Sequence, residues 1–468
     1  MSASEPFDVA VLGGGPGGYV AALRAAQLGA RVLLVEKERI GGTCLNVGCI
    51  PTKALTTATE LLRNARKAET FGLAIPSAAP DLPALMHYQR RVVDELVEGV
   101  EHLLRERRVT LSHGEGRVVR PGTLVVLGGD GTWTEHAARR VILAPGSVTA
   151  RPPIPGIDLP GVMTSTAALS VDELPRHLVV VGGGVIGLEF ACIYEALGTR
   201  VTVLEMAPTL LPGGTDETLA KRLGLVLRRR GLAIRTGVVV KAIEESPEGL
   251  RVRFAGPGDD SVEADRVLLA TGRLPNTEGP ALSDLGLKMN GRAIAVDEKL
   301  ATSVPDVWAV GDAVGGAMLA HKAMVEGRVA AENATGGTRS VDHRSVPNVI
   351  FTWPEVASVG LSEAQARASG AQVKVTQCPL SANARARILG ESDGLVKLVC
   401  EAGSGRVLGV HLMGPHATDL IAEGALAVQL GATADDLAWT THAHPTLPEA
   451  VLEAALGFRE GAIHFHSR

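Results

Sequence analysis

The chain has 468 residues, of which 46% are hydrophobic and 21% are charged, and it carries a formal net charge of −5. This balance is typical of a globular protein, and the length predicts about three domains. The mild negative charge argues against a nucleic-acid-binding surface, which requires clustered lysine and arginine. The longest strongly apolar run, residues 178–188, is interrupted by glycines, whereas a membrane helix needs about 20 apolar residues.

The N-terminal sequence, MSASEPFDVAVLGGG, predicts a cytoplasmic protein. It shows no basic segment followed by an apolar segment and a cleavage site, as a secretory signal would. Because the cytoplasm is reducing, a disulfide that serves only stability is not expected. We therefore expect neither a membrane nor a nucleic acid among the partners of this chain.

Residues 8–38, DVAVLGGGPGGYVAALRAAQLGARVLLVEKE, predict a dinucleotide-binding unit. A Val- and Leu-rich strand leads into Gly13, Gly15 and Gly18, and an Ala-rich helix and a second buried strand follow. Glycines at this spacing permit a tight turn, close approach of a pyrophosphate and close packing of helix on strand. The helix N-terminus attracts the phosphates, and Glu36 at the end of the second strand can accept hydrogen bonds from a ribose.

The same pattern recurs in residues 177–205, HLVVVGGGVIGLEFACIYEALGTRVTVLE. Its glycines are Gly182, Gly184 and Gly187, and its acid is Glu205. In both copies the acid lies 23 positions after the first glycine. One such pattern is also typical of an ordinary glycine-rich turn, but two copies in the same strand–turn–helix–strand context predict two bound dinucleotides.

The two dinucleotides are expected to differ. Asp312 follows a buried strand in TSVPDVWAVGDAVG, where it could bind the ribityl chain of FAD or serve as an ordinary turn residue. In the second copy, Glu205 would repel a 2′-phosphate, and the following residues, MAPTLLPGG, contain no arginine to neutralise one. The sequence therefore favours NAD over NADP at the second site.

The segment GGTCLNVGCIPTK, residues 41–53, places Cys44 and Cys49 five positions apart. A zinc site would need four ligands, and no second CxxC or histidine pair lies nearby, so no metal is expected. The pair follows the first dinucleotide unit directly and could open a helix, whose N-terminus would favour a thiolate. We therefore predict a redox role beside a flavin. The other cysteines fit small core or loop positions: Cys192, Cys378 and Cys400.

The C-terminal segment THAHPTLPEA contains His442, His444 and Glu449. A general base for a thiol should have a pKa near 7, as imidazole does, and a neighbouring carboxylate can orient it. Thr446 and Glu449 also match a capping box, so Glu449 could instead serve only to begin a helix. Both interpretations stay open at the level of the sequence.

These segments together resemble class I of the FAD-dependent pyridine nucleotide-disulfide oxidoreductases, over essentially the whole chain and in matching order. The resemblance rests on GGGPGGYVAA, GGTCLNVGCIPTK, GGGVIGLEF, ATGRLPNT, WAVGDA, MLAHKA, VPNVIFTWPEVASVG and HAHPTLPEA. Within that family, MLAHKA and Glu205 favour the group that oxidises dihydrolipoyl groups with NAD over relatives that reduce glutathione with NADPH.

The resemblance implies an α/β fold with two Rossmann-like dinucleotide-binding domains, a central domain and an α+β dimerisation domain. The expected FAD-binding domain spans residues 1–150 and the NAD-binding domain spans residues 151–275. A central domain that completes the FAD site would cover residues 276–345. The C-terminal dimerisation, or interface, domain would cover residues 346–468.

The resemblance also assigns cofactor positions. Those expected to contact FAD are Gly13, Gly15, Gly18, Glu36, Gly42, Thr43, Lys53, Gly116, Gly146, Ser147, Asp312, Met318, Leu319, Ala320 and His321. Those expected to contact NAD are Gly182, Gly184, Gly187, Glu189, Glu205, Val239 and Gly272. Lys53 and Glu189 match an ion pair that the family places near the flavin.

The chain departs from the family pattern at two places. Where the family reads Ala-Thr-Gly-Ser at the end of the FAD domain, this chain has Pro145 in place of the threonine, which removes a hydroxyl and a backbone N–H. Residues 417–419 read Ala-Thr-Asp, where relatives have a glycine and a glutamate. The sequence offers no physical account of the second departure.

The implied reaction is the oxidation of protein-bound dihydrolipoamide through a Cys44–Cys49 disulfide and FAD to NAD, with Cys44 exchanging with substrate and Cys49 facing the flavin. His444, held by Glu449, would be the base and would act on the other subunit of a homodimer. The partner would be a lipoyl-bearing acyltransferase or carrier protein of a 2-oxo-acid dehydrogenase or glycine cleavage complex. Two alternatives are a reductase of another disulfide, such as glutathione or mycothiol, and a non-catalytic flavoprotein that docks in an assembly.

Overall fold

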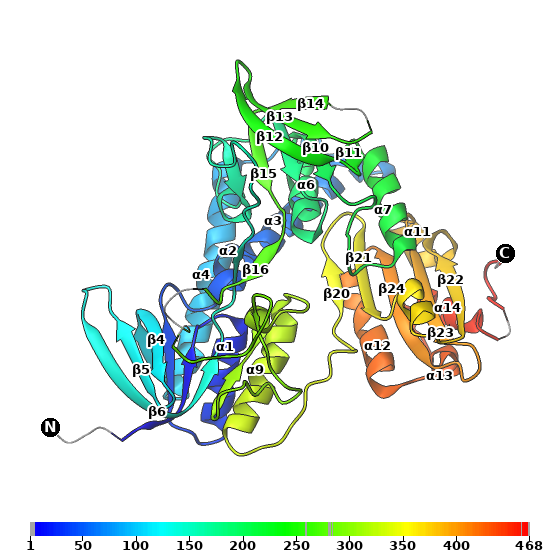
Figure 1. Ribbon diagram of the computed structural model, residues 1–468. Coiled ribbons are helices and arrows are strands. Elements are labelled where there is room, and N and C mark those ends of the chain that lie inside the picture. The colour runs from blue at the N-terminus through cyan, green and yellow to red at the C-terminus, as the bar shows by residue number, and fades with distance from the viewer. Residues whose placement is uncertain (1–4, 258–259, 279–281, 283, 460, 467–468) are drawn as a thin grey trace.

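The computed structural model describes residues 5–257, 260–278, 282, 284–459 and 461–466. The N-terminal sheet and its helices lie at the lower left of Figure 1, the second parallel sheet lies at the top, and the C-terminal sheet lies at the right. Long helices α3 (Cys49–Arg66) and α4 (Leu82–Glu106) run between the first two regions.

The N-terminal sheet has the strand order β3-β2-β1-β6-β5-β4, with β19 paired to the free side of β6. β1, β2, β3, β6 and β19 pair in parallel, whereas β4, β5 and β6 form an antiparallel meander. The strands are β1 (Phe7–Leu12), β2 (Val32–Glu36), β3 (Thr110–His113), β4 (Glu115–Arg120), β5 (Thr123–Leu127), β6 (Trp133–Leu143) and β19 (Val307–Ala309). β1 and β2 are almost entirely buried, as expected for parallel strands with helices on both faces.

The second sheet repeats this plan. Its order, β11-β10-β9-β15-β8, places the strands of the second glycine-rich unit as β3-β2-β1-β6 are placed in the first, and all its pairs are parallel. A second antiparallel meander, β12-β13-β14, corresponds to β4-β5-β6. The strands are β8 (Val162–Thr164), β9 (His177–Val181), β10 (Arg200–Glu205), β11 (Ala233–Thr236), β12 (Val239–Ser246), β13 (Gly249–Ala255), β14 (Asp260–Ala264) and β15 (Arg266–Leu269).

Two short strands join these units. β7 (Ser147–Thr149) follows the first sheet, β16 (Arg273–Pro275) follows the second, and they pair antiparallel with Ser147 opposite Pro275. The end of each Rossmann-like sheet is therefore held beside the end of the other, which brings residues far apart in sequence to one place.

The chain then returns to the first unit through β19 and α9 (Ala320–Ala334), which packs on α1 (Pro16–Gln27). The two helices come so close that a Cβ on Gly327 would lie 2.2 Å from the backbone oxygen of Gly17. Only glycine fits at such a backbone approach. This contact, in the middle of α9, holds the helix against the first dinucleotide unit.

The C-terminal sheet is antiparallel, with the order β20-β21-β24-β23-β22. Its strands are β20 (Asn348–Ile350), β21 (Glu355–Gly360), β22 (Val373–Pro379), β23 (Leu395–Glu401) and β24 (Val407–Gly414). Helices α12 (Ala417–Leu430) and α14 (Glu449–Leu456) cover one face, where Val396, Leu398 and Cys400 are buried in one cluster. These three alternate residues of β23 therefore share the face that the two helices cover.

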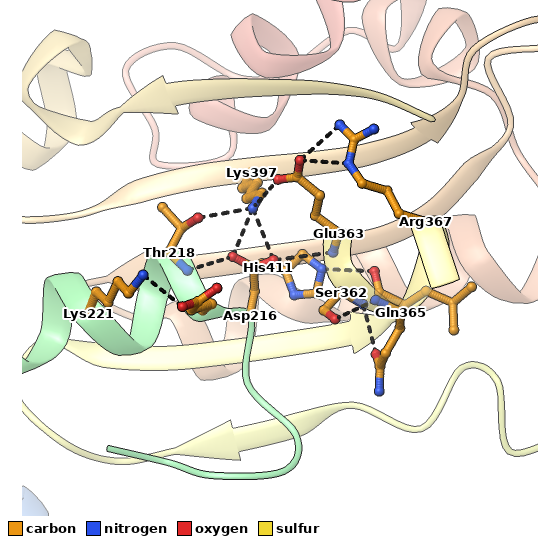
Figure 2. Close-up of polar contacts among 11 residues, drawn as sticks. Asp216, Thr218, Lys221, Ser362, Glu363, Gln365, Arg367, Lys397 and His411 are labelled. Carbon is orange, nitrogen blue, oxygen red and sulfur yellow. Dashed lines mark hydrogen bonds and ion pairs between the residues drawn. The ribbon is translucent and has the colours of Figure 1, made fainter. Parts of the chain in front are cut away.

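The other face of this sheet packs on the second unit. Lys397, on that face of β23, is almost fully buried and contacts Asp216 at 2.9 Å and Glu363 at 2.9 Å. Figure 2 shows Lys397 reaching from the sheet to Asp216 and Thr218 at the start of α7 (Glu217–Arg229). A buried charge needs such partners, so this network ties the second unit to the C-terminal sheet.

The remaining elements are short connections and covering helices. They are α2 (Gly42–Val47), η1 (Ala68–Phe71), α5 (Ser165–Ala168), α6 (Val185–Leu197), β17 (Met289–Asn290), β18 (Ala293–Ile294), η2 (Gly311–Val314), α10 (Glu363–Ala368), η3 (Leu380–Ala382), α11 (Ala384–Ile388) and α13 (Ala434–Trp439). None of the helices in the described residues combines the length and the apolar character that crossing a membrane requires. The predicted α/β class with two Rossmann-like units and a C-terminal α+β domain is confirmed.

Candidate active site

The first glycine-rich turn joins β1 to α1. Gly13 has φ +102°, and a Cβ there would lie 2.2 Å from the backbone oxygen of Ala144 on the neighbouring strand. A Cβ on Gly18 would lie 1.8 Å from the oxygen of Gly13, so α1 can pack on the turn only with glycine at this position. The backbone N–H of Gly14 donates to Glu36 Oε2 at 2.6 Å.

The second turn has the same geometry. Gly182 has φ +113° and approaches the oxygen of Ala270, and a Cβ on Gly187 would lie 2.0 Å from the oxygen of Gly182. The backbone N–H of Gly183 donates to Glu205 Oε2 at 2.6 Å. Each acid therefore orders its own turn, and because a carboxylate accepts about four hydrogen bonds, it retains free lone pairs for a ribose.

The surroundings of both turns fit a dinucleotide. Gly15 begins α1 and lies so close to Gly42 that a Cβ on Gly42 would be 2.7 Å from the Cα of Gly15. Gly184 begins α6, and a Cβ there would meet no atom within 4 Å. A cavity of about 740 Å³ adjoins Gly184 and extends to Met318 and Leu319. The free N–H groups at these helix starts could hold pyrophosphates.

Several other predicted cofactor positions converge at the ends of the two sheets. Ser147 donates to Asp312 Oδ2 at 2.5 Å, and Arg273 donates to the Ser147 hydroxyl and backbone oxygen at 2.7 Å. Gly146 and Gly272 both have positive φ and border open space. Asp312 lies in η2 just after β19, so it is a turn residue as well as a neighbour of this cluster.

The substitution of proline at position 145 leaves its carbonyl in use, because Asn276 Nδ2 donates to the Pro145 oxygen at 3.1 Å. The N–H of Asn276 donates to the oxygen of Gly146 at 2.9 Å. The second half of the chain therefore holds the 145–146 turn in place, although the proline itself has no N–H to offer a ligand.

The remaining predicted cofactor positions lie at element ends near these turns. Leu319 caps α9, which begins at Ala320, and His321 contacts the backbone oxygen of Pro347 through Nε2 at 2.7 Å. A Cβ on Gly116 would lie 2.4 Å from the Leu12 side chain, which shows a packing role for this glycine. Val239 begins β12 and is exposed. Thr43 lies in α2, where Arg273 donates to its hydroxyl at 3.4 Å.

The two cysteines lie at different places in the helices that follow the first unit. Cys44 is inside α2, and Cys49 is the first residue of α3. Both are free thiols, half-buried and close enough to hydrogen-bond each other. Cys49 opens the 18-residue helix α3, whereas Cys44 is the third residue of the six-residue helix α2, so the stronger helix dipole acts on the Cys49 sulfur.

The pair is also electrostatically unequal. The hydrogen bond from Cys44 and the charge of Lys53 together lower the pKa of Cys49 to about 7, against the effects of burial and of Glu189. The same hydrogen bond, together with burial, raises the pKa of Cys44. The structure thus makes Cys49 the thiolate of the pair, a distinction that the spacing of the two residues could not provide.

Lys53 and Glu189 form the expected ion pair. Lys53 Nζ lies 2.9 Å and 3.1 Å from the two carboxylate oxygens of Glu189. Glu189 is buried and also accepts from the backbone N–H of Phe351 at 2.9 Å, while Lys53 lies 4.6 Å from the centre of the Phe351 ring. The segments that carry Lys53, Glu189 and Phe351 are far apart in sequence, and they therefore meet at Lys53, one helical turn after Cys49.

His444 and Glu449 also meet. His444 Nδ1 lies 2.8 Å from Glu449 Oε1, and the backbone N–H of Thr446 donates to Glu449 Oε2 at 2.8 Å. Glu449 is the first residue of α14 rather than its third, and the Thr446 hydroxyl donates to Ala443 instead, so no capping box forms. The carboxylate thus holds the imidazole and leaves its Nε2 facing outward.

The neighbouring His442 has a different environment. Its side chain is buried, and its Nε2 lies 2.9 Å from Glu423 on α12 while its Nδ1 lies 2.8 Å from the oxygen of Thr440. Both ring nitrogens are therefore occupied, whereas the His444 side chain is 73% exposed. Of the two histidines, only His444 is free to meet a substrate.

The base and the cysteines lie in different regions of the same chain. In Figure 1, α14 lies at the far side of the C-terminal sheet, well away from α2 and α3. His444 and the cysteine pair of one chain thus do not form a common site within that chain.

Two residues near the site were missed by the sequence reasoning. Arg273 lies within the quoted ATGRLPNT segment but was not singled out, and Phe351 donates only through its backbone, which no sequence pattern reports. Cys192, Cys378 and Cys400 are buried, as predicted for core positions. Within the described part of the chain, no group of three or more His, Cys, Asp or Glu side chains is arranged to hold a metal ion.

Comparison with known proteins places this geometry in a family. Residues 7–327 match the family described as pyridine nucleotide-disulphide oxidoreductase, and residues 346–455 match its dimerisation domain. Curated relatives include dihydrolipoyl dehydrogenases from Thermus scotoductus and Geobacillus stearothermophilus. The first is 44% identical and covers 99% of this chain and 100% of its own. The second is 42% identical, and the match covers 96% of this chain and 95% of the relative.

Among solved structures, LpdA from Mycobacterium tuberculosis superimposes with a TM-score of 0.88 at 30% identity, over 96% of this chain and 98% of that one. The match in sequence and the match in structure thus both extend over nearly the full length, across the two dinucleotide units and the C-terminal sheet. The chain belongs to the pyridine nucleotide-disulphide oxidoreductase family.

Proposed function

We propose that the protein is an NAD-dependent dihydrolipoyl dehydrogenase that oxidises protein-bound dihydrolipoamide to lipoamide with FAD as its flavin. The observation that carries this proposal is the pair of unlike thiols at the start of α3, beside the Lys53–Glu189 ion pair. Relatives that carry this name are 40–44% identical over nearly the whole chain. An oxidoreductase of dithiols needs such a pair next to an electron acceptor.

Proton transfer begins the reaction. His444 Nε2 takes the proton of one substrate thiol, while Glu449 accepts a hydrogen bond from Nδ1–H and stabilises the imidazolium. Thr446 holds the second oxygen of Glu449, so the carboxylate keeps its orientation. The backbone N–H and His444 together lower the pKa of Glu449 against the effect of burial, which keeps this carboxyl ionised.

Thiol–disulfide exchange follows. The substrate thiolate attacks the Cys44 sulfur of the Cys44–Cys49 disulfide, and Cys49 leaves as a thiolate. Cys49 is the better leaving group because its pKa is the lower of the two. The second substrate thiol then loses its proton and attacks the first substrate sulfur, which releases lipoamide and leaves both cysteines reduced.

The dinucleotide sites provide the electron acceptors. FAD held at the first turn would supply the acceptor for the electron pair of the cysteines, and NAD held at the second turn would supply the final hydride acceptor. Gly14 and Glu36 would hold the FAD ribose, while Gly183 and Glu205 would hold the NAD ribose. The carboxylate of Glu205, with no arginine in residues 206–214, favours NAD over NADP.

The chain acts in this proposal as a cytoplasmic homodimer. His444 contacts Glu449 of α14, and Figure 1 shows α14 well away from α2 and α3, which carry the cysteines, so each site takes its cysteines from one subunit and its base from the other. In this proposal the FAD-binding domain spans residues 1–150, the NAD-binding domain 151–275, the central domain 276–345 and the interface domain 346–468. The partner is a lipoyl-bearing acyltransferase or carrier protein of a 2-oxo-acid dehydrogenase or glycine cleavage complex.

An anaerobic titration with dihydrolipoamide tests the function. The purified flavoprotein should develop the long-wavelength absorbance of a thiolate beside oxidised flavin, and NAD should then discharge it. NADPH with glutathione or mycothiol disulfide should support little turnover. A flavin spectrum unchanged by dihydrolipoamide would refute the proposal and favour a docking flavoprotein, and faster turnover with another disulfide would favour a different reductase.

A further inference from the structure

The segment between β20 and β21 touches the redox centre but has no regular structure of its own. Phe351, the first residue after β20, donates its backbone N–H to Glu189 Oε1 at 2.9 Å. Glu189 is 3% exposed and also pairs with Lys53. The position of this one N–H therefore influences how the carboxylate of Glu189 shares its charge with Lys53.

The balance between Lys53 and Glu189 acts directly on Cys49. Lys53 lowers the pKa of Cys49, whereas Glu189 raises it. The other groups that face Cys49 are Cys44 on α2 and Arg273 on β16. Lys53 and Cys49 are on the same helix, so their relative position is fixed. The parts that can move relative to Cys49 are the Glu189 carboxylate and the Phe351 N–H that holds it.

Two residues after Phe351, the Trp353 ring is surrounded by cations. Arg230, Lys67 and Arg63 lie 3.5, 3.7 and 4.2 Å from its ring centre. Trp353 Nε1 donates to Glu391 Oε1 at 3.0 Å, and Arg230 donates to the Trp353 backbone oxygen at 2.5 Å. We call Arg63, Lys67, Arg230 and Glu391 the Trp353 cage.

The Trp353 cage gathers its members from distant elements. Arg63 is in the last turn of α3, the helix that begins with Cys49, and Arg230 is the C-cap residue after α7 of the second unit. Glu391 follows α11 of the C-terminal domain. The cage therefore joins the cysteine-bearing helix, the second dinucleotide unit and the C-terminal domain at a single indole ring.

This arrangement is costly to build for packing alone. Burial lowers the pKa of Arg63, Lys67 and Arg230, and Arg63 Nε is buried with no hydrogen-bond partner among the described residues. The three cations repel one another, and cation–π attraction to the Trp353 ring offsets this repulsion. That attraction strengthens as the site is desolvated. An apolar contact would have packed the segment without these buried charges.

We propose, on the basis of the function proposed above, that Trp353 and its cage are positioning residues for the redox pair. They fix residues 351–353, so that the Phe351 N–H holds Glu189 and leaves the charge of Lys53 directed at Cys49. If the segment were released, Glu189 would lose this donor and draw more of the charge of Lys53 to itself. Cys49 would then be a weaker thiolate.

The test uses the flavin-loaded protein in a Cys44→Ser background, where Cys49 is the remaining thiol of the pair. Trp353→Leu and Arg230→Met are introduced separately, with Trp133→Leu as the control, since Trp133 is 60% exposed at the start of β6. Two readouts are followed against pH: the long-wavelength absorbance of the thiolate beside flavin, and the rate of Cys49 alkylation by iodoacetamide measured on its peptide.

Both cage variants should raise the apparent pKa of Cys49 by about one unit, the lower end of the effect of displacing a nearby charge. Arg230→Lys, which keeps the cation, should return it toward the parent value, and Trp133→Leu should leave it unchanged. A merely structural role would lower the melting temperature without moving either titration. Unchanged titrations in folded, flavin-loaded Trp353→Leu would overturn the proposal.

Two safeguards keep the test decisive. If Trp353→Leu loses its flavin, the comparison of Arg230→Met with Arg230→Lys decides the question. If the Cys44→Ser parent shows no thiolate–flavin absorbance at all, the proposed function fails, while the alkylation titrations still decide whether the cage acts on Cys49.

Discussion

At the scale of residues, the central feature is that two chemically identical side chains have opposite environments. Cys49 begins α3 and faces Lys53, whereas Cys44 lies inside α2 and donates to its neighbour. The sequence gives the same residue type at both positions, so it cannot separate their roles. The helix boundary and the position of one lysine separate them.

Replacing Lys53 tests this assignment. Lys53→Met removes the positive charge that lowers the pKa of Cys49, so that pKa should rise by at least about one unit. In the anaerobically reduced protein, the thiolate absorbance should then appear at higher pH than in the parent, whose midpoint we expect near pH 7. Lys241→Met, an exposed change on β12, is the control. Equal midpoints for Lys53→Met and the parent would show that Lys53 does not act on the thiolate.

Replacing the base tests the other half of the site. His444→Gln should reduce the rate of lipoamide oxidoreduction by about 10²–10⁴-fold, the usual contribution of a general base. Flavin binding should be retained, because His444 is exposed and contacts Glu449 of α14, whereas the dinucleotide turns lead into α1 and α6. His102→Gln, on the exposed face of α4, should be neutral. A near-normal rate in His444→Gln would place the base elsewhere.

At the scale of elements, the strongest sequence signal was the duplicated glycine-rich unit. The spacing of Gly13 and Glu36, repeated in Gly182 and Glu205, predicted two strand–turn–helix–strand units, and both are present with equivalent hydrogen bonds. The prediction succeeds because a tight backbone turn sterically requires glycine, and this requirement is visible in the sequence. The repetition extends further than the motif showed, since the meanders and the strand orders also correspond.

Contacts between elements were harder to predict. The capping-box pattern of Thr446 and Glu449 was misleading, because the helix begins two residues later than the pattern requires. The hydrogen bond of Phe351 and the cations around Trp353 depend on segments more than 100 residues apart. Such contacts leave no periodicity, and so no single-sequence pattern reports them.

The buried Lys397 is a further case, and its cost can be measured. Lys397→Met would leave Asp216 buried without its cation, which should lower the free energy of unfolding by about 3–5 kcal/mol. Lys221→Met removes an exposed partner of Glu217 on α7 and should cost at most about 1 kcal/mol. Urea unfolding of both variants makes the comparison, and equal losses would contradict it.

The pH dependence of that loss has a defined sign. Burial alone would raise the pKa of Asp216, but the hydrogen bond and charge of Lys397, with His411 and the backbone N–H of Glu363, outweigh it and the pKa lies below its ordinary value of 3.8. A carboxyl whose pKa is lowered on folding stabilises the protein at higher pH and loses that contribution as pH falls through the folded value. The difference between the parent and Lys397→Met should therefore shrink in acid.

At the scale of the whole molecule, the proposed site is divided between two regions that a single chain keeps apart. The cysteines lie on the helices that follow the first dinucleotide unit, and His444 lies beside α14 of the C-terminal domain. The match of residues 346–455 to a dimerisation domain supports a second subunit as the source of the missing half.

Mixing two inactive variants tests this division. Cys44→Ser lacks the exchanging sulfur, and His444→Gln lacks the base, so each homodimer should be inactive. In a heterodimer of the two, one site combines the intact cysteines of one chain with the intact histidine of the other. Co-expression should therefore restore activity to one of the two sites of each heterodimer. No recovery in a purified heterodimer would show that each chain works alone.

The distance between α14 and α3 has a consequence for a newly made chain. Such a chain could fold and bind both dinucleotides, yet it could not oxidise thiols until it formed a dimer with a second chain. Catalysis would then require dimerisation, and an unpaired chain would not oxidise thiols in the cell. Capacity in the cell would grow more steeply than the number of copies at low abundance.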